Sequence, residues 1–290
     1  MDNLRGAALM VLAMFGFALE DMLIKFMAVS LPVGQIIGML GLGSSVLIGT
    51  LLMVRGEALF DRAMLTPAIA IRAIGELIGT LGFVTAIALT PLSSASAILQ
   101  ATPLVVTLGA AVFLQEAVGW RRWSAILVGF LGVLLIIRPG TEGFSWLSLF
   151  ALQGVFGLAL RDLATRRVPP HTSTLQLSFL GFLVLIPAAV IMLLVAGTEI
   201  RAPSSADWLW YACALLIGIV AYYTIIAAMR VGEVSFVTPF RYSRILFALV
   251  IGVGVFSEEP DTLTLLGATI IVCSGLYTLW RERNVRANSA

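Results

Sequence analysis

Long apolar runs follow one another along almost the whole chain, and they limit the possible fold more than any other feature. A helix needs about 20 apolar residues to cross a bilayer, because each residue advances it by about 1.5 Å. The ten runs predicted to be spans are residues 5–28, 33–54, 66–89, 93–115, 122–138, 145–165, 172–197, 207–229, 234–256 and 262–280. They use most of the 290 residues, so we expect short loops and no separate soluble domain.

The composition excludes a water-soluble fold. Apolar residues make up 60% of the chain and charged residues 12%, against roughly 45–50% and 25% in soluble domains. The runs are continuously apolar, whereas the strands of a membrane barrel alternate over about ten residues, so the expected class is an all-α membrane protein. The first run carries acids and lacks a small-x-small cleavage site, so we expect it to be kept as a span.

The positions of the bases predict the orientation. With the N-terminus inside, the inner segments hold twelve Lys and Arg, and the outer ones hold only Lys25, Arg138 and Arg201. Cytoplasmic loops carry the excess of bases, so both termini are predicted to be cytoplasmic. The net charge of +2 follows from these helix-end bases, and no nucleic-acid partner is expected. Cys213 and Cys273 lie inside apolar runs, and we expect neither a metal nor a cofactor.

The chain contains the same phrase twice. Residues 14–25 read MFGFALEDMLIK and residues 155–166 read VFGLALRDLATR, 141 positions later. Residues 113–138 likewise match residues 256–281, where Glu116 answers Glu259 at a spacing of 143. The repeat therefore covers about 142 residues, or five spans.

An odd number of spans makes the second copy enter the membrane from the opposite side, so the halves are inverted. Inverted halves around a central site are typical of secondary transporters. We expect the first repeat at residues 1–138, the second at 145–281, a cavity between them, and a short cytoplasmic tail at 282–290.

Each repeat ends with a Glu near a helix terminus followed by an apolar, Gly-containing helix, LQEAVGWRRWSAILVGFLG and SEEPDTLTLLGATIIVCSG. Together with the two five-helix halves, these segments resemble the EamA-type members of the drug/metabolite transporter superfamily over essentially the whole chain. Within that family the chain is most similar to bacterial inner-membrane exporters of amino acids, including aromatic ones. The resemblance implies a multi-pass protein of the bacterial inner membrane, surrounded by lipid, that exports a small molecule by alternating access.

Charged residues inside spans are costly, so they are candidates for a functional site. Glu76 and Arg244 each lie ten residues into their spans, about 15 Å deep at about 1.5 Å per residue, close to the middle of the bilayer. We interpret them as substrate-binding residues that could form a direct ion pair. A structural clamp, or a pair between Glu76 and Arg72 at i,i+4, are the alternatives. Arg241, one turn from Arg244, is either an inner gate or a snorkelling base.

The repeated phrase places an acid and a base four residues apart in each copy. Asp21 and Lys25 lie near one mouth, and Asp162 and Arg166 near the other, where such pairs could close the path or simply anchor helix ends. Glu20 has no acidic counterpart, because the matching position is occupied by an arginine. This asymmetry makes Glu20 a candidate for binding a proton or a substrate amine.

Uncharged residues predict the walls of the path. Ser96 and Gln100 lie one turn apart on the fourth span and continue along one face through Pro103 and Thr107. Aromatic candidates for the wall are Phe17, Tyr222, Tyr223 and Tyr242, for which plain packing is the alternative. Pro103 and Pro239 are expected to break the backbone ladder inside their spans. The small-xxx-small segments GQIIG at 34–38 and GELIG at 75–79 predict close helix contacts.

These features favour a secondary transporter that exports amino acids or related small metabolites. A zwitterion needs an anion-binding group, a cation-binding group and a side-chain pocket, which Arg244, Glu76 or Glu20, and the aromatic residues can supply. A carrier of drugs or cofactor-like metabolites is the main alternative, and a non-transporting receptor or scaffold is the other. The chain has no GxxxxGK[ST] loop, HExxH or GxSxG motif, so we predict neither direct use of ATP nor an enzyme. It can act as a monomer.

Overall fold

The computed structural model describes residues 2–61, 64–113, 120–138, 145–165, 167–169, 171–231 and 238–287, and in these ranges the chain forms helices without strands. The α-helices are α1 (Asp2–Met27), α2 (Val33–Val54), α3 (Pro67–Leu89), α4 (Leu92–Leu99), α5 (Thr102–Phe113), α6 (Trp120–Ile137), α7 (Ser148–Thr165), α8 (Thr174–Ala196), α9 (Ser205–Val231), α11 (Ser243–Phe256) and α12 (Thr262–Ala287), and η2 (Thr238–Tyr242) is a 3₁₀ helix. The all-α prediction is confirmed.

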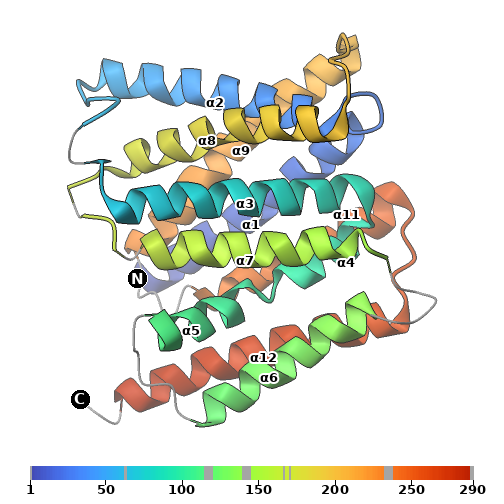
Figure 1. Ribbon diagram of the computed structural model, residues 1–290. Helices are drawn as coiled ribbons and strands as arrows, with labels where there is room; N and C mark the ends of the chain where they lie inside the picture. The colour runs from blue at the N-terminus through green and yellow to red at the C-terminus, as the bar shows by residue number, and fades with distance from the viewer. Residues whose placement is uncertain are drawn as a thin grey trace.

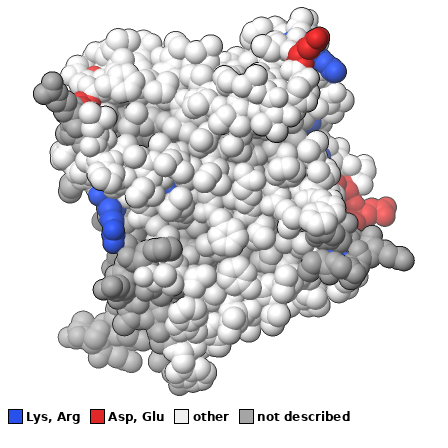
Figure 2. All heavy atoms as spheres, viewed as in Figure 1, with Lys and Arg blue, Asp and Glu red and all other residues white. Residues whose placement is uncertain are grey.

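The described helices have the length and the surface of a membrane protein. Five of them, α1, α2, α3, α8 and α9, are long and apolar enough to cross a bilayer by length and composition. Figure 2 shows a face whose broad middle is almost free of charge, while its charged side chains gather towards the two ends. A belt of apolar surface between charged ends is the arrangement that a bilayer favours.

Two of the predicted spans are broken. The fourth consists of α4 and α5, which are separated at Gln100 and Ala101, just before Pro103 in the first turn of α5. A proline cannot donate a backbone hydrogen bond and its ring clashes with the preceding turn, so the ladder stops there. The described part of the ninth consists of η2, which contains Pro239, followed by α11. The last helix runs to Ala287, which is longer than the predicted span and takes in most of the expected tail.

The most extensive helix contacts all join one half of the chain to the other. They are α1 with α9, α2 with α8, α3 with α7, and α6 with α12. In Figure 1, α3 and α7 run side by side through the centre, α2 and α8 lie above them, and α6 and α12 lie below. The bundle is therefore built from pairs that each take one helix from either repeat.

Glycines bring α3 and α7 into backbone contact. A Cβ atom added to Gly75 would lie 2.5 Å from the backbone nitrogen of Arg161, and one added to Gly82 would lie 2.5 Å from that of Gly154. A Cβ on Gly157 would overlap the backbone of Gly79. Any side chain at these positions would push the helices apart, which explains the small-xxx-small spacing. The predicted close contact of GELIG is confirmed by these distances.

The contacts also establish that the halves are inverted. Along α3 and α7 the contacting residue numbers rise on one helix as they fall on the other, so the two are antiparallel. Successive spans cross in opposite directions, so α1 and α3 run the same way, and α7, the counterpart of α1, therefore runs against α1. The first turn of α1 and the last turn of α12 lie at the same end of the bundle (Figure 1). The prediction of two inverted repeats is confirmed.

Candidate functional site

A buried ion pair joins the first span to the ninth. Nη2 of Arg244 on α11 lies 2.6 Å from Oδ2 of Asp21 on α1. The same guanidinium lies over two rings, with its Cζ 5.2 Å from the centroid of Phe17 and 5.0 Å from that of Phe83. Such cation–π contacts stabilise a desolvated arginine. The buried Nε of Arg244 has no hydrogen-bond partner among the described residues, so one donor is free for a further acceptor.

A second charged cluster lies where α3, α7 and α9 meet. Oε1 of Glu76 accepts a hydrogen bond from Nη1 of Arg161 at 3.2 Å, and its Oε2 lies 3.8 Å from Nη2 of Arg72. The hydroxyl of Tyr222 accepts from Nη2 of Arg72 at 2.7 Å and donates to Oε2 of Glu76 at 3.4 Å. Arg72 and Glu76 are only 5% and 6% exposed, so these charges are compensated by each other instead of by water.

Asp162 extends this cluster towards the ninth span. Nη2 of Arg161 lies 2.8 Å from Oδ1 of Asp162, and Nη1 of Arg241 on η2 lies 3.5 Å from Oδ2. Arg161 therefore bridges two acids, Glu76 and Asp162. Breaking a buried ion pair by removing one partner costs about 3–5 kcal/mol, so this bridge is a strong constraint on how α3 and α7 meet.

The two aspartates of the repeated phrase take partners from the same broken span. Asp21 of the first copy binds Arg244, and Asp162 of the second binds Arg241, three residues earlier. The break between η2 and α11 thus lies between two arginines, and each arginine is held by a different half of the molecule. An element held from both halves is suited to respond when the halves move.

Two pairings that the sequence left open are not formed in the described structure. Arg244 and Glu76 do not pair with each other in the described structure, because each takes its partner from another helix. Asp21 does not pair with Lys25 either, although both are on α1. The i,i+4 contact between Arg72 and Glu76, which was the alternative reading, is present. Arg166 and Glu116 lie outside the described residues.

Lys25 instead belongs to a latch at the far end of α1. Its Nζ donates to the carbonyl oxygen of Thr90 at 2.6 Å and lies 3.4 Å from Oε1 of Glu258. Glu258 in turn accepts from the backbone nitrogens of Leu92 and Ser93 at 2.6 and 3.0 Å, and from Oγ of Ser93 at 2.7 Å. It therefore caps the first turn of α4.

These bonds set the ionisation of Glu258. Burial opposes the charged form, but the hydrogen bonds from Ser93 and Leu92 and the nearby Lys25 ammonium outweigh it, so the pKa of this carboxyl is lowered. Sequence reasoning missed Glu258 because it matched Glu116 with Glu259. A uniform repeat of 142 residues would have matched Glu116 with Glu258 instead.

The uncharged candidates divide into buried and exposed residues. Ser96 is fully buried with its Oγ unpartnered in the described structure, and Nε2 of Gln100 donates to its carbonyl oxygen at 3.4 Å. Tyr242 is 4% exposed and its buried hydroxyl also has no partner in the described ranges. Tyr223 is 51% exposed, so it faces outwards, which removes it from the candidate site. Tyr222, its neighbour, faces the charges.

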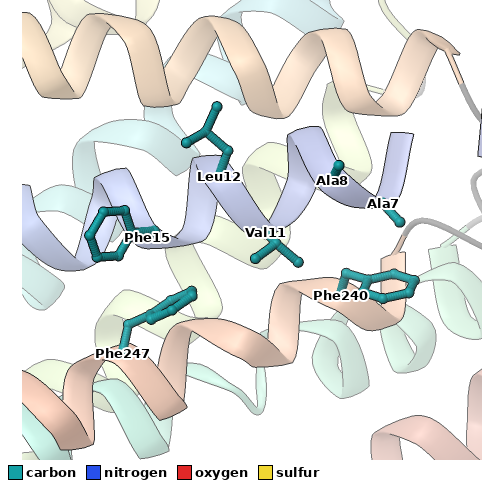
Figure 3. A pocket seen from close by; sticks show the side chains of 7 residues that line it. All are labelled: Ala7, Ala8, Val11, Leu12, Phe15, Phe240 and Phe247. Carbon is teal, nitrogen blue, oxygen red and sulfur yellow. The ribbon is translucent and has the colours of Figure 1, made fainter. Parts of the chain in front are cut away.

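A groove runs between α1 and the ninth span. It has a volume of about 600 Å³ and is lined only by apolar side chains, Ala7, Ala8, Val11, Leu12, Phe15, Phe240 and Phe247. Figure 3 shows Phe15 of α1 and Phe247 of α11 close together in it, and their ring centroids are 5.2 Å apart. A groove without a polar group suits lipid acyl chains better than a polar solute, so it is not part of the candidate site. In the described part of the chain, no group of three His, Cys, Asp or Glu residues is placed to hold a metal ion.

Comparisons with known proteins agree with this architecture. Residues 4–138 and 145–280 each match the EamA-like transporter family. The chain is 31% identical over 203 residues to the riboflavin transporter of Vibrio cholerae, a match that covers 67% of each protein. It is 26% identical over 195 residues to the S-adenosylmethionine uptake transporter of Rickettsia felis, covering 67% of this chain and 65% of that protein.

Two further comparisons cover nearly the whole chain. The pseudopaline exporter CntI of Pseudomonas aeruginosa is 26% identical over 276 residues, with 92% of this chain and 93% of that protein covered. A protein of known crystal structure superposes with a TM-score of 0.56 at 18% identity, covering 94% of this chain and 98% of the other. The last comparison shows a shared fold.

Proposed function

Because the chain belongs to the EamA-like transporter family, and is thus a multi-pass membrane transporter of small metabolites and not an enzyme, we propose that it exports amino acids or closely related zwitterions by alternating access. In this proposal the repeats at residues 1–138 and 145–281 move against each other around the buried charges. The chain lies in a bacterial inner membrane with both termini in the cytoplasm, and it works as a monomer.

One observation carries the proposal: buried arginines and acids meet between the halves, inside membrane-spanning helices. Arg244 with Asp21, and Arg161 with Glu76, each offer both signs of charge. A zwitterion can replace either pair, because its carboxylate binds the arginine while its ammonium group binds the acid. Exchanging one paired arrangement for another avoids leaving an unpaired charge in the membrane.

The direction of transport is argued from the relatives. The match to the pseudopaline exporter covers nearly all of both proteins, whereas the matches to the riboflavin and S-adenosylmethionine transporters cover about two thirds of those proteins. The fuller match favours export. The same riboflavin and S-adenosylmethionine names favour the second candidate function, a carrier of cofactor-like metabolites.

The test is flux into proteoliposomes that contain the purified chain. The panel consists of labelled phenylalanine, threonine, methionine, riboflavin and S-adenosylmethionine, each measured with and without a pH gradient. We expect uptake of at least one amino acid well above that of empty liposomes. Uptake of riboflavin or S-adenosylmethionine alone would establish the second candidate instead, and binding without flux of any compound would favour a receptor.

Two variants test whether the buried charges form the site. Glu76→Gln and Arg244→Ala are expected to abolish flux while the protein remains folded, and Arg201→Ala, at an exposed loop position, is the matched control. Flux at the wild-type rate from either site variant would exclude that residue from the site. Protease protection of tags at the two termini tests the orientation separately.

A further inference from the structure

Glu20 of α1 is an acid inside a predicted span, and its carboxylate has no partner in the part of the chain that the structure describes. It directly precedes Asp21, lies partly buried, and forms no hydrogen bond or ion pair with any described residue. Its carboxylate lies against Gly218 of α9, where an added Cβ atom would overlap it. An ionised and unpaired carboxylate inside a membrane span is costly, and a bound proton removes that cost without any movement of the side chain.

The charged groups around Glu20 are already engaged elsewhere. Arg244, the cation that faces it from α11, is bound to Asp21 at 2.6 Å. On the other elements packed against α1, Arg72 and Glu76 of α3 bind each other and Tyr222 of α9, and Arg241 of η2 binds Asp162. Lys25, further along α1, is held by Glu258. Glu20 and Asp21 therefore share a single arginine.

The protonation state of Glu20 sets the net charge of the whole cluster. The cluster contains four arginines, Arg72, Arg161, Arg241 and Arg244, and three acids that are paired with them, Asp21, Glu76 and Asp162. With Glu20 ionised the sum is zero, and with Glu20 protonated it is +1.

The space around Glu20 distinguishes a proton from a substrate amine. The carboxylate fills the gap left by the missing side chain of Gly218, and it does not line the apolar groove between α1 and the ninth span. A substituted ammonium group needs room beside the acid, but a proton needs none. The counterpart position in the second half lacks this option because it is Arg161, whose guanidinium stays protonated and is bound by two acids.

We propose that Glu20 is the proton-binding group of the transport cycle. It is protonated while α1 and α9 are closed on it, and it releases the proton to water when that contact opens. The O–H bond breaks and the proton passes to water on the cytoplasmic side, and the carboxylate takes up a proton from water on the outer side before α1 and α9 close on it again. This inference rests on the proposed function, and it adds that one proton is exchanged for each substrate.

The test separates coupling from transport in the same proteoliposomes, with a pH-sensitive dye inside and each compound of the panel as the probe. The wild type is expected to accumulate substrate by up to about tenfold for each unit of pH gradient, as one proton per substrate requires. Glu20→Gln is expected to lose this accumulation, and its substrate exchange is expected to become independent of pH. Glu199→Gln, at an exposed loop position, is the matched control and keeps the wild-type behaviour.

Each result decides between the alternatives. Wild-type exchange without proton movement would overturn the proton proposal and leave the proposed function standing, whereas no exchange of any compound would overturn the proposed function itself. A Glu20→Gln variant that still accumulates substrate, but needs much more of it for half-maximal exchange, would assign Glu20 to the substrate amine. If Glu20→Gln does not fold, Glu20→Asp is expected to keep coupling with a shifted pH dependence, and unchanged pH dependence would overturn the proposal.

Discussion

In α7 the repeated phrase carries Arg161 and Asp162, and both are saturated with partners, since Arg161 binds two acids and Asp162 binds two arginines. In α1 the same phrase carries Glu20 and Asp21, and of these two only Asp21 is paired with another described residue. The backbone environment has been kept in both copies, because Gly16 and Gly157 each lie against a helix of the opposite half. The duplication thus preserved the packing and allowed the charges to diverge, leaving a clamp in one copy and a free acid in the other.

The largest effect on the yield of folded protein is expected at the matching glycines of the repeated phrase, because the two copies differ most in how tightly these glycines pack. Gly157→Ala would place a methyl group into the backbone of Gly79, whereas Gly16→Ala would bring it to 2.9 Å from Cβ of Ala221. Overpacking costs about 1–3 kcal/mol, and more where backbone must move. We expect Gly157→Ala to lose most of the folded protein and Gly16→Ala to lose clearly less, measured as the monodisperse yield in detergent. Equal yields would show that the α3–α7 contact is no tighter than the α1–α9 contact.

The next effect comes from the charges of the two copies. Arg161→Gln removes the shared partner of Glu76 and Asp162 and is expected to cost about 3 kcal/mol, as for a broken buried pair. Glu20→Gln at the matching position removes no pair and should leave the thermal midpoint close to that of the wild type. Thermal unfolding followed by tryptophan fluorescence measures both. A larger loss from Glu20→Gln than from Arg161→Gln would reverse the assignment of clamp and free acid.

The latch between Lys25 and Glu258 should contribute less stability than the Arg161 bridge, and its contribution should depend on pH. The pKa of Glu258 is lowered in the folded protein, so its stabilising effect is complete above its ordinary value of about 4.3 and is lost as the pH falls through the lowered value. Glu258→Gln is expected to lower the thermal midpoint by a constant amount from pH 8 to about pH 5. Below that range the difference from the wild type should shrink. A difference that instead grows on acidification would mean that the latch is formed by the neutral acid.

The smallest effect on stability is expected from an ion pair that lies outside both copies of the repeated phrase. Asp261 precedes α12 and binds Arg138, which lowers the pKa of the carboxyl to about 2. Its side chain is 48% exposed, and exposed pairs contribute about 0–1 kcal/mol. Asp261→Asn should change the thermal midpoint by no more than a degree or two at moderate salt, and less at high salt. A change as large as that of Arg161→Gln would mean that burial does not set the strength of pairs in this protein.

The sequence is sufficient to predict the helices but not the faces they turn to one another. Apolar runs, Pro103 and the repeat give the spans, the break in the fourth span and the inversion, because these depend on local chemistry and chain length. The contact of Glu76 with Arg72 follows from their i,i+4 spacing, but its second partner could not be predicted, since Arg161 reaches it from a helix 85 positions later. Tyr222 and Tyr223 differ by about 100° around α9, and a helix that is apolar on all sides gives no sign of which one points inwards.

The pairing of helices across the repeats has a consequence for how the protein is made. During synthesis, α1, α2 and α3 enter the membrane before α9, α8 and α7 exist. Their glycine-lined faces must stay against lipid or an insertion factor until the second half of the chain arrives. A fragment that ends between the halves would therefore be an incomplete surface, and not a small transporter of its own.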